Sequence, residues 1–284
     1  MPAPPPDARS MRAEALSVEA CGDDGFILRV ATEAVLPPLR AARFFMLRRE
    51  DRLSPAIPRP FSIYRQVGRE LWFLIKVMGT GTAALGACVP GTPLRLIGPL
   101  GNGWPALDGD GAPWVMLAGG IGSAPFYMAI EQALAGMDGA RPARPEQLVY
   151  LYGAARRGLL YDLEAFQSLG VRVAVCTDDG SFGMRANVLQ LLAHLQERKE
   201  IPATVRLLAC GPERMLEAVE AHARRTGTEA WLSLETLMGC GVGICNGCPV
   251  PTIPDGPRGK WPNAKCCVEG PVFSTGEVTL AAGH

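Results

Sequence analysis

The chain of 284 residues carries 28 basic and 28 acidic side chains, and 48% of its residues are hydrophobic. This length and apolar content suffice for two or three domains, while the neutral balance excludes the strong global field that draws a protein to nucleic acid or an anionic membrane. The first residues lack the pattern of a signal peptide and no apolar run reaches the ~18 residues of a membrane helix, so we expect a cytoplasmic protein without nucleic-acid or membrane partners.

The first third of the chain predicts an antiparallel Greek-key β-barrel. Residues 1–11 are proline-rich and predict a disordered tail, so the barrel domain is expected to span 12–108. Short apolar runs alternate there with Gly and Pro turns, and several such strands at close spacing are typical of a small barrel. The expected strands cover 26–30, 44–47, 71–77 and 93–97.

The middle of the chain, residues 109–230, repeats a strand, a turn and a helix. Strands that alternate with helices predict a parallel α/β domain of the nucleotide-binding kind. Beyond it, residues 231–284 lose regular pattern among cysteines and glycines, consistent with a small domain held together by a cofactor. The expected strands of the middle domain are 114–118, 147–152, 171–176 and 205–210, and the expected helices are 126–134, 160–169, 186–196 and 212–225.

Cysteines gather near the end of the chain in the spacing C-x4-C-x2-C, formed by Cys240, Cys245 and Cys248. A fourth thiolate can come from Cys266 or Cys267, and the residues alone leave that choice open. The spacing is the plant type for a 2Fe-2S cluster, and the intervening glycines allow the backbone to wrap tightly around an anionic core. Structural zinc is an alternative, although zinc sites usually pair their ligands as two short hooks; disulfides or free thiols are another.

The barrel stretch contains the succession Arg59-Pro60-Phe61-Ser62. A guanidinium fork can hold a pyrophosphate, an aromatic ring can lie against a ring system, and a hydroxyl can hydrogen-bond a ring nitrogen. A proline that begins a strand beside an exposed arginine explains the same residues without any ligand. On its own, this motif is therefore weak evidence for a ligand site.

A glycine-threonine turn, Gly79-Thr80-Gly81-Thr82, follows the strand expected at 71–77. The turn opens a short helix, whose free N–H groups and positive dipole end can receive a diphosphate. A plain capped helix after a turn is the alternative.

Further turns follow the expected strands of the middle domain. Gly119-Gly120-Ile121-Gly122 lies between a buried strand and a helix, as in dinucleotide sites, although it does not match G-x-G-x-x-G. Thr177-Asp178 and Cys210-Gly211 end later strands and are expected at the same carboxyl edge of the sheet, where ligands bind. Acid-rich helix caps and a buried cysteine before a turn are the alternatives.

Taken in order, these motifs resemble those of the ferredoxin-reductase-like flavoproteins. Within that family, the chain is similar from about residue 12 onward to the iron-sulfur electron-transfer subunits of NAD-dependent dihydroorotate dehydrogenases. Its most specific part is the glycine-cysteine run together with the ending Cys267-Val268-Glu269-Gly270-Pro271-Val272-Phe273. The other matching motifs are Arg59-Pro60-Phe61-Ser62, Gly79-Thr80-Gly81-Thr82, Gly98-Pro99-Leu100-Gly101-Asn102-Gly103, Gly119-Gly120-Ile121-Gly122 and Cys210-Gly211-Pro212.

The resemblance implies FAD on the barrel, NAD(H) at the α/β domain and a 2Fe-2S cluster at the end of the chain. Cys267 is implied as the fourth ligand because it stands three residues before the Gly-Pro pair, whereas Cys266 departs from the family pattern, and the stretch between Cys248 and Cys267 is longer than usual. The implied cluster ligands are Cys240, Cys245, Cys248 and Cys267; the expected flavin residues are Arg59, Pro60, Phe61, Ser62, Leu74, Ile75, Lys76, Gly81 and Thr82; and the expected dinucleotide residues are Gly119, Gly120, Gly122, Thr177, Asp178, Cys210 and Gly211.

The resemblance further implies an oxidoreductase subunit that carries electrons between NAD(H) and an FMN-containing dihydroorotate dehydrogenase catalytic subunit, in a heterotetramer that serves pyrimidine biosynthesis. Ser62 would then tune the flavin nitrogen that receives the hydride, with Cys210 near the nicotinamide. The three histidines form no catalytic arrangement, which favours an electron carrier. Two alternatives remain: a reductase subunit serving a hydrogenase, a sulfite reductase or a ferredoxin:NADP transhydrogenase, and a zinc-stabilised nucleotide-binding module. The choice between NADH and NADPH stays open.

Overall fold

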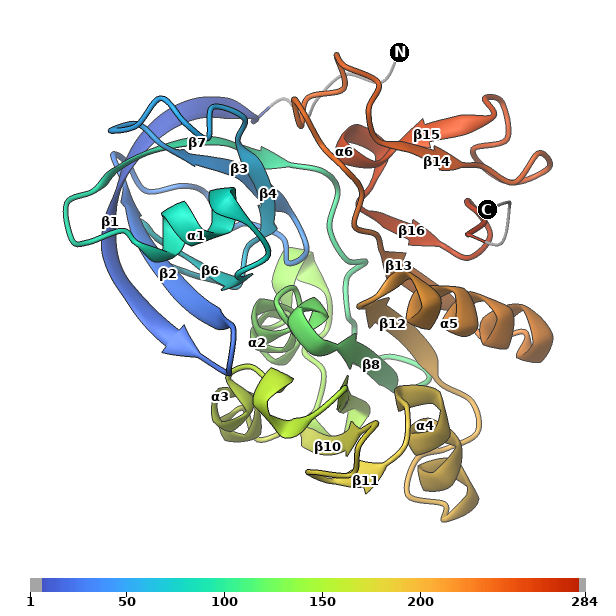
Figure 1. Cartoon of the computed structure of the whole chain (residues 1–284). Helices are drawn as coiled ribbons and strands as arrows, with labels where there is room; N and C mark the ends of the chain where they lie inside the picture. Colours follow the sequence, from blue (N-terminus) through green and yellow to red (C-terminus); the bar gives the residue numbers. More distant parts are fainter. Residues whose placement is uncertain (1–6, 281–284) are drawn as a thin grey trace.

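Two seven-stranded sheets, one from each of the two larger predicted domains, organise the computed structural model (Figure 1). The structure describes residues 7–280. A third, two-stranded sheet lies in the C-terminal segment, where β14 (Pro249–Pro251) pairs with β15 (Asn263–Lys265) and the short helix α6 (Cys266–Glu269) follows. The predicted combination of an antiparallel barrel, an α/β domain and a small C-terminal segment is confirmed.

The first sheet is antiparallel and runs in the order β4-β3-β7-β1-β2-β6-β5. Its two edge strands, β4 and β5, are separated in sequence only by Ile63 and Tyr64, so the edges lie near one another and the sheet curls into a half-barrel. Apolar side chains fill the inside of the curl. The elements are β1 (Arg9–Cys21), β2 (Gly25–Thr32), β3 (Phe44–Arg49), β4 (Arg59–Ser62), β5 (Arg65–Val67), β6 (Glu70–Lys76), α1 (Thr80–Gly86) and β7 (Pro93–Leu100).

The longest strand, β1, is absent from the predicted strands. It has 13 residues, begins at Arg9 inside the expected tail, and pairs with both β2 and β7 at the centre of the sheet; residues 1–6 of that tail lie outside the described residues. Met11, Ala13 and Ala15 are buried on alternate positions of β1. The period of two is therefore present, but small alanine side chains give it a weak signal.

The second sheet runs in the order β11-β10-β9-β8-β12-β13-β16 and is parallel except for its last pair. Every residue of β8 is buried, as expected for a central parallel strand covered on both faces. The strands are β8 (Trp114–Gly119), β9 (Leu148–Ala154), β10 (Arg172–Thr177), β11 (Met184–Arg185), β12 (Arg206–Cys210), β13 (Ala230–Ser233) and β16 (Val272–Ser274). The helices are α2 (Tyr127–Ala135), α3 (Leu163–Ser168), α4 (Val188–Glu197) and α5 (Glu213–Thr226), with 3-10 turns η1 (Gly120–Ser123), η2 (Met137–Gly139), η3 (Pro145–Gln147) and η4 (Arg157–Leu159).

The C-terminal segment returns to the α/β sheet, which the sequence did not predict. Strand β16 pairs with β13 in antiparallel register, with Leu232 opposite Phe273. The predicted boundary between residues 230 and 231 falls inside β13. The domain boundaries stay predictions.

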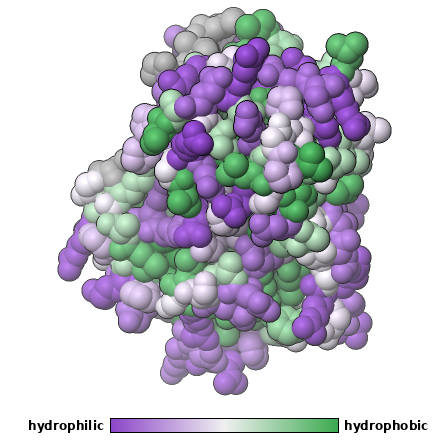
Figure 2. All heavy atoms as spheres, turned by 90° about the vertical axis from the view of Figure 1, so that its left-hand side faces the viewer, coloured by the Kyte–Doolittle hydropathy of each residue, from purple (hydrophilic) through white to green (hydrophobic). Residues whose placement is uncertain are grey.

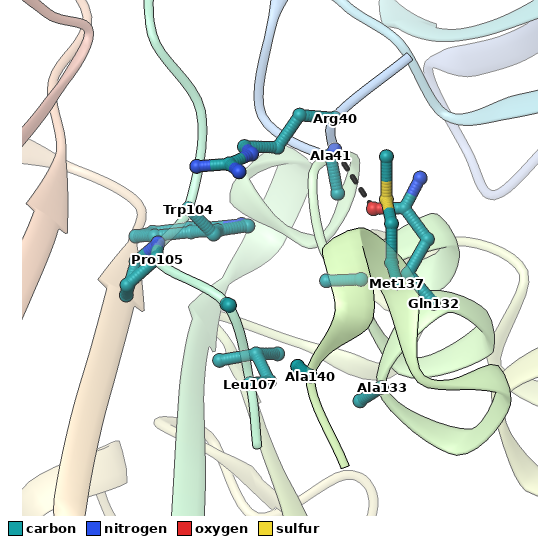
Figure 3. Close-up of a pocket in the computed structure, with 11 residues that line it drawn as sticks. Arg40, Ala41, Trp104, Pro105, Leu107, Gln132, Ala133, Met137 and Ala140 are labelled. Carbon is teal, nitrogen blue, oxygen red and sulfur yellow. Dashed lines mark hydrogen bonds between the residues drawn. The ribbon is translucent and has the colours of Figure 1, made fainter. Parts of the chain in front are cut away.

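Side chains from α2 fasten the α/β domain to the barrel. The amide of Gln132 accepts a hydrogen bond from Ala41 N at 3.0 Å (Figure 3). It also donates one to Leu39 O at 2.6 Å. The Gln132 side chain and the Trp104 ring lie on different sides of a pocket with about 330 Å³ of empty space. None of the predicted site residues lines this pocket, which lies at the junction of the two domains.

Hydrophobic groups on the barrel side of the molecular surface are dispersed. Figure 2 shows them on that face in patches interspersed with hydrophilic side chains. Within residues 7–280, no helix is both long and apolar enough to cross a membrane.

Candidate cofactor cleft and cluster loop

A cleft with about 900 Å³ of empty space, open to solvent, lies between the barrel and the α/β sheet. Its mostly apolar lining with a few polar groups is typical of a cofactor site. On the α/β side, Ile121 and Cys210 line it. On the barrel side it brings together seven of the nine predicted flavin residues: Pro60, Phe61, Ser62, Leu74, Ile75, Lys76 and Thr82.

Strand β4 supplies the motif side chains from an edge of the barrel. All four of its residues are half-buried, and Ser62 stands opposite Phe44 of β3. An edge strand is paired on one side only, so its side chains and backbone remain available to a ligand. Ser62, Phe61 and Phe44 all line the cleft.

Arg59 and Gly81 lie together in a shallow neighbouring pocket rather than in the large cleft. A Cβ atom on Gly81 would stand 2.8 Å from Arg59 Nε, so glycine allows the guanidinium to pack directly on the turn. Arg49 and Arg52 line the same pocket. Arg49 is paired with Asp51 and donates to Ala84 O and Ala87 O at the end of α1. The Arg59 guanidinium on the turn at Gly81 is therefore the positive group that fits the predicted diphosphate seat.

Two of the predicted flavin side chains are engaged in structural contacts. The Thr82 hydroxyl accepts hydrogen bonds from Met78 N (2.8 Å) and Gly79 N (3.1 Å), and it donates to Gly79 O. The Lys76 ammonium lies 3.4 Å from the Asp24 carboxylate. Thr82 therefore shapes the turn, and Lys76 is held at the edge of the cleft.

The glycine turn after β8 is needed for close packing against β12. A Cβ on Gly122 would stand 2.3 Å from the carbonyl oxygen of Cys210, and one on Gly119 would stand 2.7 Å from Met215 Sδ. Cys210 is 4% exposed, and burial, together with the charge of Glu235, raises the pKa of its thiol. The thiol is therefore neutral at physiological pH and can only donate weakly or pack.

The remaining dinucleotide candidates lie along the sheet edge but outside the cleft lining. Thr177 is fully buried, and its hydroxyl donates to Phe182 O (2.9 Å) and accepts from Phe182 N (3.1 Å) within its own loop. Asp178 is exposed at the end of β10. The structure gives no contact of Gly120 or Gly211 with the cleft, so their roles stay predictions.

Sequence reasoning missed the segment that forms the third wall of the cleft. Residues 233–238 lead from the end of β13 directly toward Cys240, and five of them line the cleft: Ser233, Leu234, Glu235, Thr236 and Met238. Prediction of β13 as a strand beside β12 would have placed this segment at the cleft. The run 230–233 is, however, too short to be distinguished from the loops around it. Pro271, from the C-terminal end, also lines the cleft.

The four cysteines of the implied cluster form two pairs. Cys245 N donates to Cys240 Sγ at 3.4 Å. Burial raises the pKa of the Cys240 thiol, but hydrogen bonds from backbone N–H groups lower it by more, so that the pKa is about 7. A hydrogen bond between the Cys248 and Cys267 thiols lowers the pKa of Cys248 to about 6 and raises that of Cys267. Thiolates bind metals, so two of these side chains are already poised to do so.

The Cys266 thiol contacts the backbone of the segment before the cysteine loop. The thiol is fully buried and lies 3.7 Å from Leu234 O, while the backbone N–H of Cys266 donates to Cys248 O at 2.9 Å. Burial raises the pKa of Cys266 to about 12. The geometry therefore favours Cys267 as the fourth ligand.

The cluster loop wraps tightly at two glycines. Gly241 and Gly243 have φ angles of 72° and 81°, and a Cβ on them would stand 2.6 Å from Met46 Cγ and 2.7 Å from Val268 Cγ2. In the described part of the chain, no three His, Cys, Asp or Glu side chains gather closely enough for one metal ion. Two thiol pairs wrapped by a glycine loop would supply two thiolates to each iron of a two-iron cluster.

We expect Glu235→Gln to raise the melting temperature of the apoprotein near pH 7.5. Although the Glu235 side chain reaches solvent, desolvation of its carboxyl raises the pKa, so folding takes up a proton there. Stability is lost as the pH rises from the ordinary glutamate value through the raised value, and because the side chain is solvent-exposed the gain in melting temperature should be small. The uncharged amide avoids this loss, and its advantage should vanish below about pH 4. Melting curves at both pH values check the prediction.

Glu200→Gln is the matched control for that experiment. Arg198 and Arg172 lower the pKa of the Glu200 carboxylate, so this variant should lower the melting temperature near pH 7.5. An advantage of Glu235→Gln that is equal at both pH values would contradict the assigned cause.

Comparison with known proteins agrees with the geometry. Residues 235–279 match the family model described as the iron-sulfur cluster binding domain of dihydroorotate dehydrogenase B. The dihydroorotate dehydrogenase B (NAD(+)) electron transfer subunit of Desulforamulus reducens is 33% identical over 240 residues, 83% of this chain and 85% of that one. The subunit of the same name from Geobacillus thermodenitrificans is 30% identical over 275 residues, 95% of this chain and 98% of that one.

Solved structures show the same fold. The structure of an NADH-dependent reduced ferredoxin-NADP oxidoreductase matches with a TM-score of 0.77 and 25% identity, over 94% of this chain and 90% of that one. A ferredoxin NADP+ reductase from Neisseria gonorrhoeae matches with a TM-score of 0.63 and 17% identity, over 78% of this chain and 93% of that one. Because it is 30% and 33% identical to the two curated subunits over most of its length, the chain belongs to the family of dihydroorotate dehydrogenase B (NAD(+)) electron transfer subunits.

Proposed function

We propose that the chain carries electrons between NAD(H) and an FMN-containing dihydroorotate dehydrogenase catalytic subunit, through FAD in the cleft and a 2Fe-2S cluster in the C-terminal loop. The single observation that carries this proposal is the shared wall of the cleft. Residues 233–238 line the cleft together with the β4 motif and lead straight into the cysteine loop. A cofactor in the cleft would thus be separated from the cluster by this one segment.

The barrel residues would hold and orient the flavin. A flavin, when bound, exchanges a hydride on one side for single electrons on the other. Phe61 and Phe44 offer aromatic surface, the Ser62 hydroxyl can donate to or accept from a ring nitrogen, and Arg59 offers a fork for the diphosphate. Cys210 and Ile121, on the opposite wall, would orient the nicotinamide of NAD(H).

The cluster would be held by two thiol pairs, Cys240 with Cys245 and Cys248 with Cys267. Cys245 is exposed, whereas Cys248 and Cys267 are buried toward the protein. The exposed side of the loop is therefore the side at which a partner subunit could approach. We place the assembled protein in the cytoplasm as a heterotetramer of two chains of each kind.

A reductase subunit for a different partner is the second candidate. It is favoured by the similarity in fold and sequence to the NADH-dependent reduced ferredoxin-NADP oxidoreductase. Both candidates use the same cleft and the same cysteines, so the identity of the electron acceptor separates them.

The protein purified without oxygen should contain flavin and about two irons and two acid-labile sulfides per chain. NADH should bleach both the flavin and the cluster absorption. After mixing with a dihydroorotate dehydrogenase catalytic subunit, dihydroorotate should reduce NAD+, measured as NADH absorbance. Reduction of ferredoxin, without coupling to that subunit, would favour the second candidate. A colourless sample that stays flavin-free after addition of FAD would contradict both.

A further inference from the structure

The turn between β1 and β2 projects from the barrel against the α/β domain. Asp24, in this turn, receives a hydrogen bond from the Tyr161 hydroxyl (2.5 Å), and its carboxylate lies 3.4 Å from the Lys76 ammonium. The Asp24 carbonyl also accepts a hydrogen bond from Val77 N (2.7 Å). One residue therefore contacts the end of β6, which lines the cleft, and a tyrosine of the other domain.

Tyr161 continues this connection into the α/β domain. Its backbone N–H donates to the Tyr152 hydroxyl (2.7 Å), and that hydroxyl donates to the carbonyl oxygen of Gly120 (3.0 Å). Gly120 begins η1, the glycine turn whose Ile121 lines the cleft. Both tyrosines are fully buried, so solvent does not compete for these hydrogen bonds.

Glycines let the two domains approach closely around the connection. A Cβ on Gly22 would stand 2.7 Å from Gly158 O, and a Cβ on Gly25 would stand 2.8 Å from the Tyr161 ring. A backbone hydrogen bond from Asp23 N to Gly158 O (2.8 Å) lies beside them. The contact is therefore tightly packed at the point where the hydrogen bonds cross between domains.

We infer that Asp24, Tyr161 and Tyr152 are positioning residues that fix the distance between the flavin wall and the nicotinamide wall of the cleft. The inference rests on the proposed function, because it assumes that Lys76 borders the flavin and that the turn at Gly120 faces NAD(H). The three residues form one path of polar contacts from the end of β6 to the start of η1, which runs through the Asp24 carboxylate, the hydroxyl and backbone N–H of Tyr161 and the Tyr152 hydroxyl. None of them lines the cleft, so they act through the residues that do.

The expected effect is on hydride transfer rather than on binding. Transfer needs the two rings at a defined separation, and a displacement of about 1 Å can slow a reaction by about a hundredfold. Loss of one hydroxyl from the path should loosen that separation without removing any ligand contact. NADH affinity should therefore change far less than the rate.

The test compares Tyr161→Phe and Asp24→Asn with wild type in the flavin-loaded protein. We expect the rate of flavin reduction at saturating NADH to fall about tenfold in each. The NADH concentration for half-maximal rate should change less than about twofold, and the double variant should be no slower than the slower single variant. A second readout uses the apoprotein: amide hydrogen exchange over Gly120–Ser123 should become faster in both variants, with the melting temperature nearly unchanged.

Glu131→Gln is the matched control. Glu131 pairs with Arg65 at 2.7 Å in another contact between the barrel and α2, and its exposure is similar to that of Asp24. It should leave the rate and the exchange unchanged. Equal slowing in all three single variants, or rates equal to wild type in Tyr161→Phe and Asp24→Asn, would overturn the inference. If NADH fails to reduce the wild-type flavin, the proposed function fails, and unchanged exchange over Gly120–Ser123 still overturns the inference independently.

Discussion

Cys267→Ala should abolish the iron-sulfur cluster, whereas Cys266→Ala should retain it. The Cys267 thiol lowers the pKa of Cys248 in the cluster loop, whereas the adjacent Cys266 thiol lies 3.7 Å from Leu234 O. Removal of one of four thiolates leaves an iron without its full ligand set. Iron and acid-labile sulfide should be about two each per chain in Cys266→Ala and near zero in Cys267→Ala.

The two variants are matched because both remove a thiol from a side chain that is at most 1% exposed. Each should therefore lose a comparable amount of packing, and only the metal content should separate them. Retention of the cluster in Cys267→Ala together with its loss in Cys266→Ala would reverse the ligand assignment. Equal retention in both would show that the fourth ligand lies elsewhere.

Gly122→Ala should destabilise the α/β domain by about 3 kcal/mol, at the upper end of overpacking effects. The added methyl group would meet the backbone of Cys210 and Gly211 at 2.3–2.6 Å, and backbone atoms cannot move aside as a side chain can. The free energy of unfolding of the apoprotein, from urea titration followed by tryptophan fluorescence, measures the loss. NADH reduction of the flavin should fall with it, because β8 and β12 would separate at the cleft.

Gly120→Ala, two residues earlier, provides the comparison. Gly120 has a φ of 53°, and no atom lies within 4 Å of the position that an added methyl group would occupy, so alanine there meets backbone strain but no clash. That strain costs about 1 kcal/mol. A Gly122→Ala variant as stable as Gly120→Ala would mean that β12 shifts more easily than the packing indicates.

Local patterns in the sequence predicted most elements of the two sheets. Central strands such as β8 and β12 are continuous apolar runs, and the expected helix at 212–225 coincides closely with α5 (Glu213–Thr226). These signals are local, because a strand that is buried on both faces has apolar residues at nearly every position. Strand β1 was missed because two of its buried positions are occupied by alanine, whose small side chain gives a weak hydrophobic signal.

Site candidates could be named from the sequence where their chemistry is encoded in one short stretch. The structure brings seven of the flavin candidates together in one cleft, and their roles stay predictions. The wall formed by residues 233–238 was missed because it becomes a wall only through tertiary contact with β12 and β16. Thr177 was chosen for its place at a strand end, yet its hydroxyl is used inside its own loop. Strand order predicts which loops lie at the same edge of the sheet, but it does not predict which of their side chains point into the cleft.

The antiparallel strand β16 makes the cluster segment part of the sheet that it serves. Val272–Ser274 covers the outer side of β13, so the backbone groups on the edge of β13 that faces away from β12 find partners only after Cys267, the last of the proposed ligands, has been passed. A chain cut after the α/β domain would leave β13 as an open edge, a template for self-association. The iron-sulfur segment therefore cannot be transferred to another reductase by itself. The transferred piece would have to include β16, and the recipient would need a sheet edge with which β16 can pair.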